Sequence, residues 1–280
     1  MEDSLRQGLR DLGYTEGENI VIDWRRSGRT PEQMRQQASE LAKSEIDLIV
    51  TMGTPATRAA LDATRKPVVF IVGDPVASGF AASLAKPGGN ATGVSTISTE
   101  LNQKRLDLLR EVAPHARRIA YLTNPSNPLA AHALAEMQNA ARTLHLQLLP
   151  LSAQNADEID AAPKELRHGK ADGLIVSADL GLVAYKAKIA RVVREARIPA
   201  MFPFKEYHDV GVLMSYGADQ HAALRRVARY IDRILRGDKP ADLPIEQTST
   251  YEMTIDMRVA RQMHVDVPEA LLLRADEVIR

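Results

Sequence analysis

The stretch IDLIVTMGTP, residues 46–55, runs from an apolar strand through a small polar loop into a helix that starts with proline. The same unit recurs at residues 68–75 and 119–128. Such loops lie at the carboxyl ends of parallel strands, where helix N-termini leave backbone N–H groups unpaired. The sequence therefore predicts a ligand-binding cleft.

Helices and strands alternate along most of the chain, which predicts parallel sheets wound by right-handed crossovers and hence an α/β fold. The expected strands are residues 20–24, 46–51, 67–72, 91–95, 118–123, 146–151, 173–177, 199–202 and 211–216. The expected helices are residues 3–13, 31–44, 55–64, 77–85, 128–144, 156–168, 182–196 and 219–236. A further helix is expected after Thr99, which would cap it, and Pro163 should kink or break the helix at 156–168. The pattern predicts two Rossmann-like doubly wound lobes of about 110 residues each.

The expected N-terminal lobe comprises residues 1–113 plus 215–244, and the C-terminal lobe residues 114–214 plus 245–280. The chain should return to the first lobe because its last part is too short to fold alone. A doubly wound lobe normally begins with a strand that feeds its first helix, whereas this sequence begins at that helix. We therefore expect the first strand of lobe 1 to be missing, which would leave an unpaired edge beside residues 20–24 and 46–51.

Composition narrows the classes of function. The chain has 280 residues, 45% of them hydrophobic, with 36 basic and 36 acidic side chains. It has no run of Lys and Arg long enough to predict binding to nucleic acid or to a membrane surface. It has no cysteine, which excludes disulfides and thiolate sites. No segment reaches the roughly 18 apolar residues of a membrane span. Met1 leads into charged residues, so we expect no export signal in this sequence.

Loop residues of the first lobe have the chemistry to hold a zwitterion. Thr54 is expected to cap a helix that begins with Pro55, so that its hydroxyl and the next backbone N–H groups could hold a carboxylate. The alternative is an ordinary cap with water on it. Asp74 could accept a hydrogen bond from a ligand ammonium, or it could close its own loop as an Asx-turn.

The second lobe repeats this arrangement. Asn127 precedes Pro128 as Thr54 precedes Pro55, and Asn124 should be extended toward the cleft. Ser177 and Asp179 end a strand, where a carboxylate would complement an amino group. The alternatives are turn chemistry for the two asparagines and helix capping for Asp179.

Aromatic side chains make up only 4% of the chain, yet Phe202, Phe204 and Tyr207 lie close together and Tyr216 follows. Core packing would explain one or two of them, whereas a wall for a flat ligand side chain would explain the group. Trp24 is expected to pack on a strand rather than to contact a ligand. The seven histidines show no metal spacing, and nucleophile elbows, P-loops and dinucleotide fingerprints are missing, so we expect no enzyme activity, no metal and no cofactor.

Several short motifs, in this order, resemble the ABC-transporter substrate-binding proteins of the tryptophan/tyrosine-binding type. They are Gly53 to Ala56, Gly73 to Val76, LAKPGGNATG at 84–93, KRLDLL at 104–109, Asn124 to Pro128, LMSYG at 213–217, KPADLP at 239–244 and RADEVI at 274–279. The resemblance implies a type I periplasmic-binding-protein fold, with two lobes that close on a small ligand. Members ordinarily carry a signal or lipoprotein peptide and a first strand. We expect both to be missing here, and a late gene start or a truncated chain would be the simplest explanation.

The resemblance implies the solute-binding component of an ABC importer. We expect it to be extracytoplasmic and monomeric, to capture an amino acid, perhaps aromatic, between its lobes, and to deliver that ligand to a membrane permease. The alternative is a cytoplasmic sensor or regulator on the same fold. The expected ligand-binding residues are Thr51, Gly53, Thr54, Pro55, Asp74, Val76 and Tyr216 in the expected first lobe, and Asn124, Ser126, Asn127, Ser177, Asp179 and Phe204 in the second.

Overall fold

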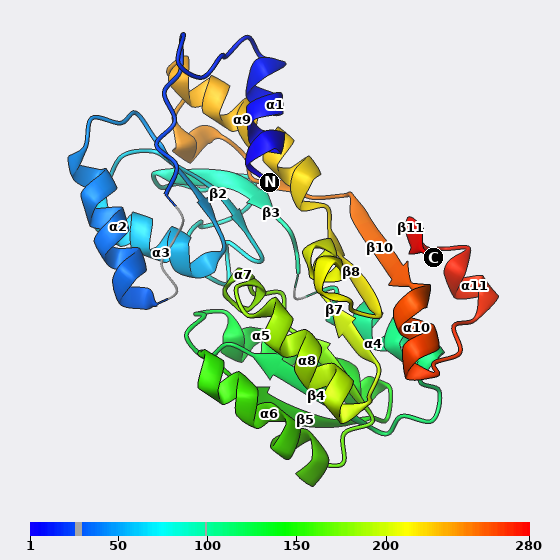
Figure 1. The fold of residues 1–280 in the computed structure, drawn as a ribbon. Coiled ribbons are helices and arrows are strands. Elements are labelled where there is room, and N and C mark those ends of the chain that lie inside the picture. The colour runs from blue at the N-terminus through cyan, green and yellow to red at the C-terminus, as the bar shows by residue number, and fades with distance from the viewer. Residues whose placement is uncertain (26–29, 99) are drawn as a thin grey trace. The chain divides into compact units, whose positions relative to one another are not determined.

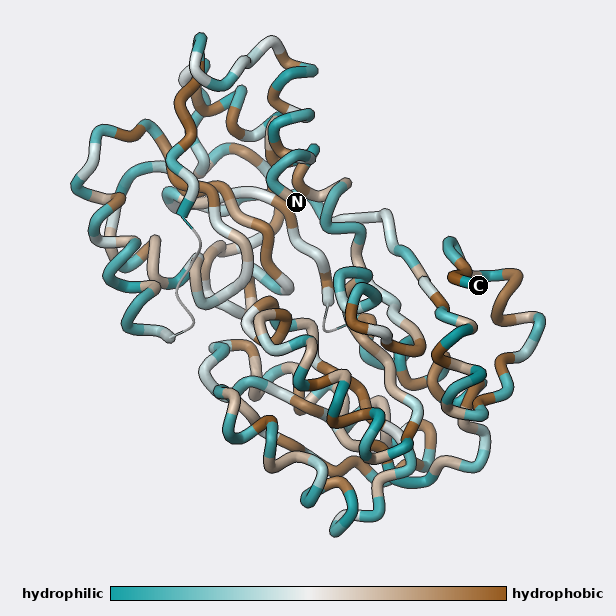
Figure 2. The backbone as a smooth tube through the Cα atoms, in the orientation of Figure 1, coloured by the Kyte–Doolittle hydropathy of each residue, from teal (hydrophilic) through white to brown (hydrophobic). Residues whose placement is uncertain are grey.

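Two compact units make up the computed structural model, which describes residues 1–25, 30–98 and 100–280 (Figure 1). Unit 1 comprises Met1–Ile97 and Asp219–Thr250, and unit 2 comprises Ser98–Ala218 and Tyr251–Arg280. The chain therefore passes from one unit to the other three times. The strands at the centre of each sheet are mostly hydrophobic, whereas the covering helices alternate between hydrophobic and hydrophilic residues (Figure 2).

The first passage between units lies at Ile97, earlier than the boundary expected near residue 114. Helix α4 (Asn102–Val112) belongs to unit 2 because its buried leucines, Leu106, Leu108 and Leu109, join the hydrophobic core of that unit. The last passage lies at Thr250 rather than near residue 245. The expected helix cap at Thr99 lies outside the described residues.

Unit 1 is a four-stranded parallel sheet in the order β1-β2-β3-β9. Its elements are α1 (Glu2–Arg10), α2 (Pro31–Lys43), β1 (Ile49–Met52), α3 (Thr54–Ala63), β2 (Val68–Val72), β3 (Ala91–Ser95), α9 (Gln220–Leu235), η2 (Pro240–Asp242) and β9 (Glu246–Gln247). Successive residues of β2 point to opposite faces: Val69 and Ile71 pack with α1 and α9, and Phe70 packs on the side of α3. The expected return of residues 219–236 to the first sheet is thus confirmed.

The expected strand at residues 20–24 is wrong. Ile20 makes only an isolated bridge with Glu16, and Ile22 and Trp24 pack at the border of the unit 1 core without joining the sheet. Among the described strands, only β2 pairs with β1, which therefore stands at the edge. An alternating apolar segment becomes a strand only where a neighbour offers hydrogen bonds.

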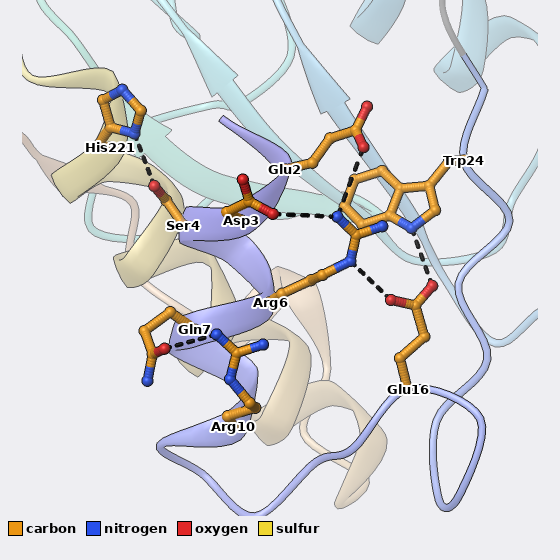
Figure 3. A network of polar contacts seen from close by, with 9 residues as sticks. All are labelled: Glu2, Asp3, Ser4, Arg6, Gln7, Arg10, Glu16, Trp24 and His221. Atoms are coloured by element: carbon orange, nitrogen blue, oxygen red, sulfur yellow. Dashed lines mark hydrogen bonds and ion pairs between the residues drawn. The ribbon is translucent and has the colours of Figure 1, made fainter.

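Contacts with Arg6 of α1 and with Glu16 hold this segment instead (Figure 3). The Trp24 indole Nε1 donates to Glu16 Oε1 over 3.0 Å, and Arg6 Nε donates to Glu16 Oε2 over 2.8 Å. The Arg6 guanidinium lies 4.6 Å from the centre of the Trp24 ring, within cation–π range. On another side of α1, Ser4 Oγ and His221 Nδ1 of α9 are 2.7 Å apart. Trp24 thus packs at the border of the unit 1 core, as expected, but it lies in a segment that is not a strand.

Unit 2 is a seven-stranded sheet in the order β11-β10-β8-β7-β6-β4-β5, parallel except between β8 and β10. Besides α4, its elements are β4 (Arg118–Thr123), α5 (Ala130–Thr143), β5 (Gln147–Ser152), α6 (Ala156–His168), β6 (Gly173–Val176), α7 (Leu180–Val183), α8 (Lys186–Ala196), β7 (Ala200–Phe202), η1 (Lys205–Val210), β8 (Met214–Ala218), β10 (Tyr251–Asp256), α10 (Met257–Met263), α11 (Glu269–Leu272) and β11 (Glu277–Ile279). Helix α6 runs through Pro163 without a break, and the expected helix 182–196 is divided into α7 and α8.

Gly93 in β3 provides a test of the unit 1 sheet. Its φ is +147°, and an added Cβ would lie 2.1 Å from the Phe70 carbonyl oxygen of β2. Gly93→Ala should therefore force the two central strands apart and lower the free energy of unfolding by roughly 3 kcal/mol, the upper end for overpacking. Gly89→Ala is the matched control because no atom lies within 4 Å of its added Cβ. Equal urea midpoints for the two variants would contradict this packing.

Candidate functional site

The loop between β1 and α3 turns at Gly53, whose φ is +86°. Gly53 is the N-cap of α3, and Thr54 is its first helical residue, so the prediction that Thr54 caps the helix is wrong. The glycine makes the corner that an extended threonine would have made, and it has no side chain with which to cap. The first turn of α3 nevertheless presents backbone N–H groups without intrahelical acceptors.

Asp74 follows β2 at the same edge of the sheet. Its Oδ1 accepts from Val76 N over 3.0 Å and from Ala77 N over 2.9 Å, which is the Asx-turn considered as the alternative. The helix expected at residues 77–85 is wrong, since turns occupy residues 75–79. The N–H of Gly53 donates to Ile71 O over 2.8 Å, so the loops that follow β1 and β2 are neighbours.

Thr51, Pro55 and Val76 complete the first-lobe set. Thr51 Oγ1 lies 2.8 Å from Thr57 Oγ1, which ties it to α3. Pro55 lies in the first turn of α3. Val76 is exposed to solvent. We call these residues, with Gly53, Thr54 and Asp74, the unit 1 loop group.

Asp179 is the centre of the polar loops in unit 2. It is 3% exposed, its Oδ2 accepts from Asn127 Nδ2 over 2.9 Å, and its Oδ1 accepts from Gly181 N over 2.6 Å as the cap of α7. Burial raises the pKa of this carboxyl group, and hydrogen bonds from Asn127, Gly181 and Asn124 oppose that rise. The structure thus brings Asn124 and Asn127 to Asp179, which lies more than 50 residues further along the chain.

The two asparagines also shape their own loop, as the alternative of turn chemistry predicted. Asn124 Oδ1 accepts from Ser126 N over 3.0 Å, and Asn127 Oδ1 accepts from Leu129 N over 2.9 Å. Helix α5 begins later, after Leu129, so Asn127 is not its cap. Ser126 Oγ donates to Gln154 Oε1 over 2.9 Å, which joins the loops after β4 and β5.

The other predicted residues of unit 2 differ in exposure. Ser177 is buried directly after β6. Phe204 is buried in the same core cluster as Phe202 and Tyr207, so core packing accounts for all three aromatic rings. Tyr216 in β8 is half-buried, and burial raises the pKa of its hydroxyl. We call Asn124, Ser126, Asn127, Ser177, Asp179, Phe204 and Tyr216 the unit 2 loop group.

Three residues near this group escaped the sequence analysis. The ring of Tyr251 lies 6.3 Å from that of Tyr216, Gln154 bonds Ser126, and Arg105 binds the backbone of β8. Gln154 could have been found because it follows a strand at the same edge as the other loops. Tyr251 and Arg105 carry no such local signal, because antiparallel pairing and helix packing bring them there.

Across residues 1–25, 30–98 and 100–280, we find no group of three or more metal-ligating side chains. Nor does any helix in these ranges have the length and apolar character needed to cross a membrane. Two α/β units, each with polar loops at the carboxyl ends of its parallel strands, are the architecture of proteins that bind small ligands.

The family model described as "ABC transporter substrate binding protein" matches residues 1–279. A curated relative, the tyrosine-binding protein of Clostridioides difficile, is 27% identical over 252 residues, which cover 89% of this chain and 72% of the relative. A conserved domain protein of Vibrio cholerae superposes with a TM-score of 0.92 at 26% identity, covering 99% of this chain and 94% of that one. An "ABC domain in complex with L-Trp from Streptococcus pneumonia" gives a TM-score of 0.92 at 25% identity, covering 99% and 93%.

The chain belongs to the family of ABC transporter substrate-binding proteins. Its fold is that of the type I periplasmic binding proteins, which confirms the expected α/β class. Membership in this family favours the solute-binding role over the sensor or regulator that the sequence alone left open.

A double-mutant cycle on Asn127→Ala and Asp179→Ala tests the centre of the unit 2 loop group. A buried hydrogen bond to a carboxylate should give a coupling energy of about 1.5 to 3 kcal/mol in urea unfolding. The exposed pair Ser126 and Gln154 is the matched control, for which we expect less than about 0.5 kcal/mol. Additive losses at Asn127 and Asp179 would show that their contact contributes nothing to the loop.

Proposed function

We propose that the protein is the solute-binding component of an ABC importer and captures an amino acid with an aromatic side chain. The observation that carries the ligand class is the pair of half-buried tyrosine rings, Tyr216 and Tyr251, whose planes are inclined by 32°. A third flat ring can extend such a pair. The relatives support this choice, since one is named for tyrosine binding and another was solved with L-Trp.

The charged ends of the ligand require complementary groups. In the unit 1 loop group, the N-terminus of α3 offers backbone N–H groups to a carboxylate. Asp74 uses Oδ1 for its Asx-turn, which leaves Oδ2 for a ligand ammonium. In the unit 2 loop group, Asn124, Ser126, Asn127, Ser177 and Asp179 are proposed to shape the polar wall, with Tyr216 beside it. That both groups face one ligand stays a prediction.

The proposed partner is an ABC permease in the membrane. The protein would act outside the cytoplasm, either free or anchored to lipid, as a monomer that needs no cofactor. Membership in the substrate-binding family supports the permease as partner, because these proteins pass their ligand to the membrane component. The same membership supports a protein that binds its substrate without transforming it.

A ligand screen tests the proposal directly. Amino acids with aromatic side chains should raise the unfolding temperature, and at 100 times the dissociation constant the stabilisation should reach about 2.7 kcal/mol. Aliphatic amino acids, sugars and nucleosides should give smaller shifts. Stabilisation by sugars or nucleosides, with none by amino acids, would overturn the ligand class while leaving the family unchanged.

Asp74→Asn separates the charge of Asp74 from its role in the loop. The amide oxygen can still accept from Val76 N and Ala77 N, so stability should stay within about 0.5 kcal/mol of the wild type. Loss of the negative charge should weaken amino-acid binding roughly tenfold in calorimetric titration. Asp62→Asn, at an exposed position of α3, is the matched control. Unchanged affinity in Asp74→Asn would remove Asp74 from the site.

A further inference from the structure

Arg105 in α4 is a buried cation that the proposed site does not use. It is 1% exposed, and burial lowers the pKa of its guanidinium to about 10, so the side chain remains charged at neutral pH. In the described part of the chain, no carboxylate forms an ion pair with it. Burying a charge without a counterion costs free energy unless hydrogen bonds satisfy its N–H groups. The acceptors of the Arg105 guanidinium therefore matter for the stability of this region.

Two of its hydrogen bonds reach segments that run between the units. Nη1 donates to Ser98 O over 2.8 Å, and Nε donates to Tyr216 O over 2.9 Å. Ser98 is the first residue of unit 2 after the first passage, and Tyr216 lies two residues before the second passage at Ala218. A third bond, from Nη1 to Asn102 Oδ1 over 3.2 Å, stays within α4.

Backbone pairing joins the third connecting segment to the other two. Tyr251 is paired with Ala218 in the ladder between β10 and β8. Within unit 1, Thr248 N donates to Ser95 O over 2.8 Å. The third segment is thus tied to the second and to the first by the main chain, and the side chain of Arg105 ties the first to the second.

We propose that Arg105 is a positioning residue of the hinge, which holds the unit 2 ends of the first and second connecting segments together and thereby tunes ligand affinity without touching the ligand. This inference rests on the proposed function, because affinity is its readout. Hinge motion concentrates in a few backbone segments, so a tie between two of them limits which conformations the hinge adopts. The planar guanidinium suits this role because its donors point to two carbonyl groups in a fixed geometry.

The test compares Arg105→Met and Arg105→Lys with Arg110→Met, a matched loss of charge on the same helix. Hydrogen exchange of the ligand-free proteins is measured over residues 94–98 and 214–218, and affinity is titrated with an aromatic amino acid and its carboxamide. In Arg105→Met, exchange should accelerate at both segments, and both ligands should lose affinity by the same factor, roughly tenfold. Arg105→Lys should recover part of the loss, and Arg110→Met should match the wild type.

Wild-type exchange and affinity in a folded Arg105→Met would overturn the inference. A selective loss of the carboxylate-bearing ligand would overturn it too, since it would make Arg105 a ligand contact. If Arg105→Met fails to fold, Arg105→Lys, which keeps the charge, decides by the same measurements. A wild-type protein that binds no amino acid contradicts the proposed function, and the exchange of the ligand-free variants still decides whether Arg105 holds the two segments.

Discussion

Parallel strand pairing is the constraint on which the rest of this structure depends. Within each unit, a crossover returns every parallel strand in the same direction, so that the loops after successive strands emerge at one edge of the sheet. The register of β1 with β2 makes the loops of Gly53 and Asp74 neighbours. The order β5-β4-β6 does the same for the loops that carry Gln154, Asn127 and Asp179.

Several polar side chains in these loops are already hydrogen-bonded within the protein. Asp179 is held by Asn127 and Gly181, and Thr51 is held by α3. A loop whose side chains are fixed in this way loses little conformational entropy when a ligand binds. We therefore propose that residues with several hydrogen bonds inside the protein shape the site. Groups with fewer such bonds, such as Asp74 Oδ2 and the first N–H groups of α3, would contact the ligand.

The sequence predicted the elements whose signals are local, and it failed where a distant partner decides. The helices expected at residues 31–44 and 219–236 are present as α2 and α9, and their end signals are local: Thr30 and Gln33 form a capping box at α2, and α9 ends before Gly237. Residues 20–24 alternate like a strand but have no neighbouring strand among those described. The boundary between units was expected near residue 114, yet the buried leucines of α4 assign that helix to unit 2.

The candidate site shows the same division between local and distant signals. Strand ends followed by Asn, Asp or Thr located Asn127, Asp179 and Asp74, because the loop pattern is local. The roles of these residues could not be predicted, since a carboxylate that caps α7 and a carboxylate that binds an ammonium look alike in sequence. Arg105 could not be found at all, because its partners, Ser98 O and Tyr216 O, are backbone atoms brought to it by the fold.

The most direct test of the central claim is a crystal structure of the protein with the aromatic amino acid that stabilises it most. Our account predicts ligand density in contact with the unit 2 loop group, with the ligand side chain against Tyr216. An amino acid bound away from both loop groups would contradict the account, even if its affinity were high.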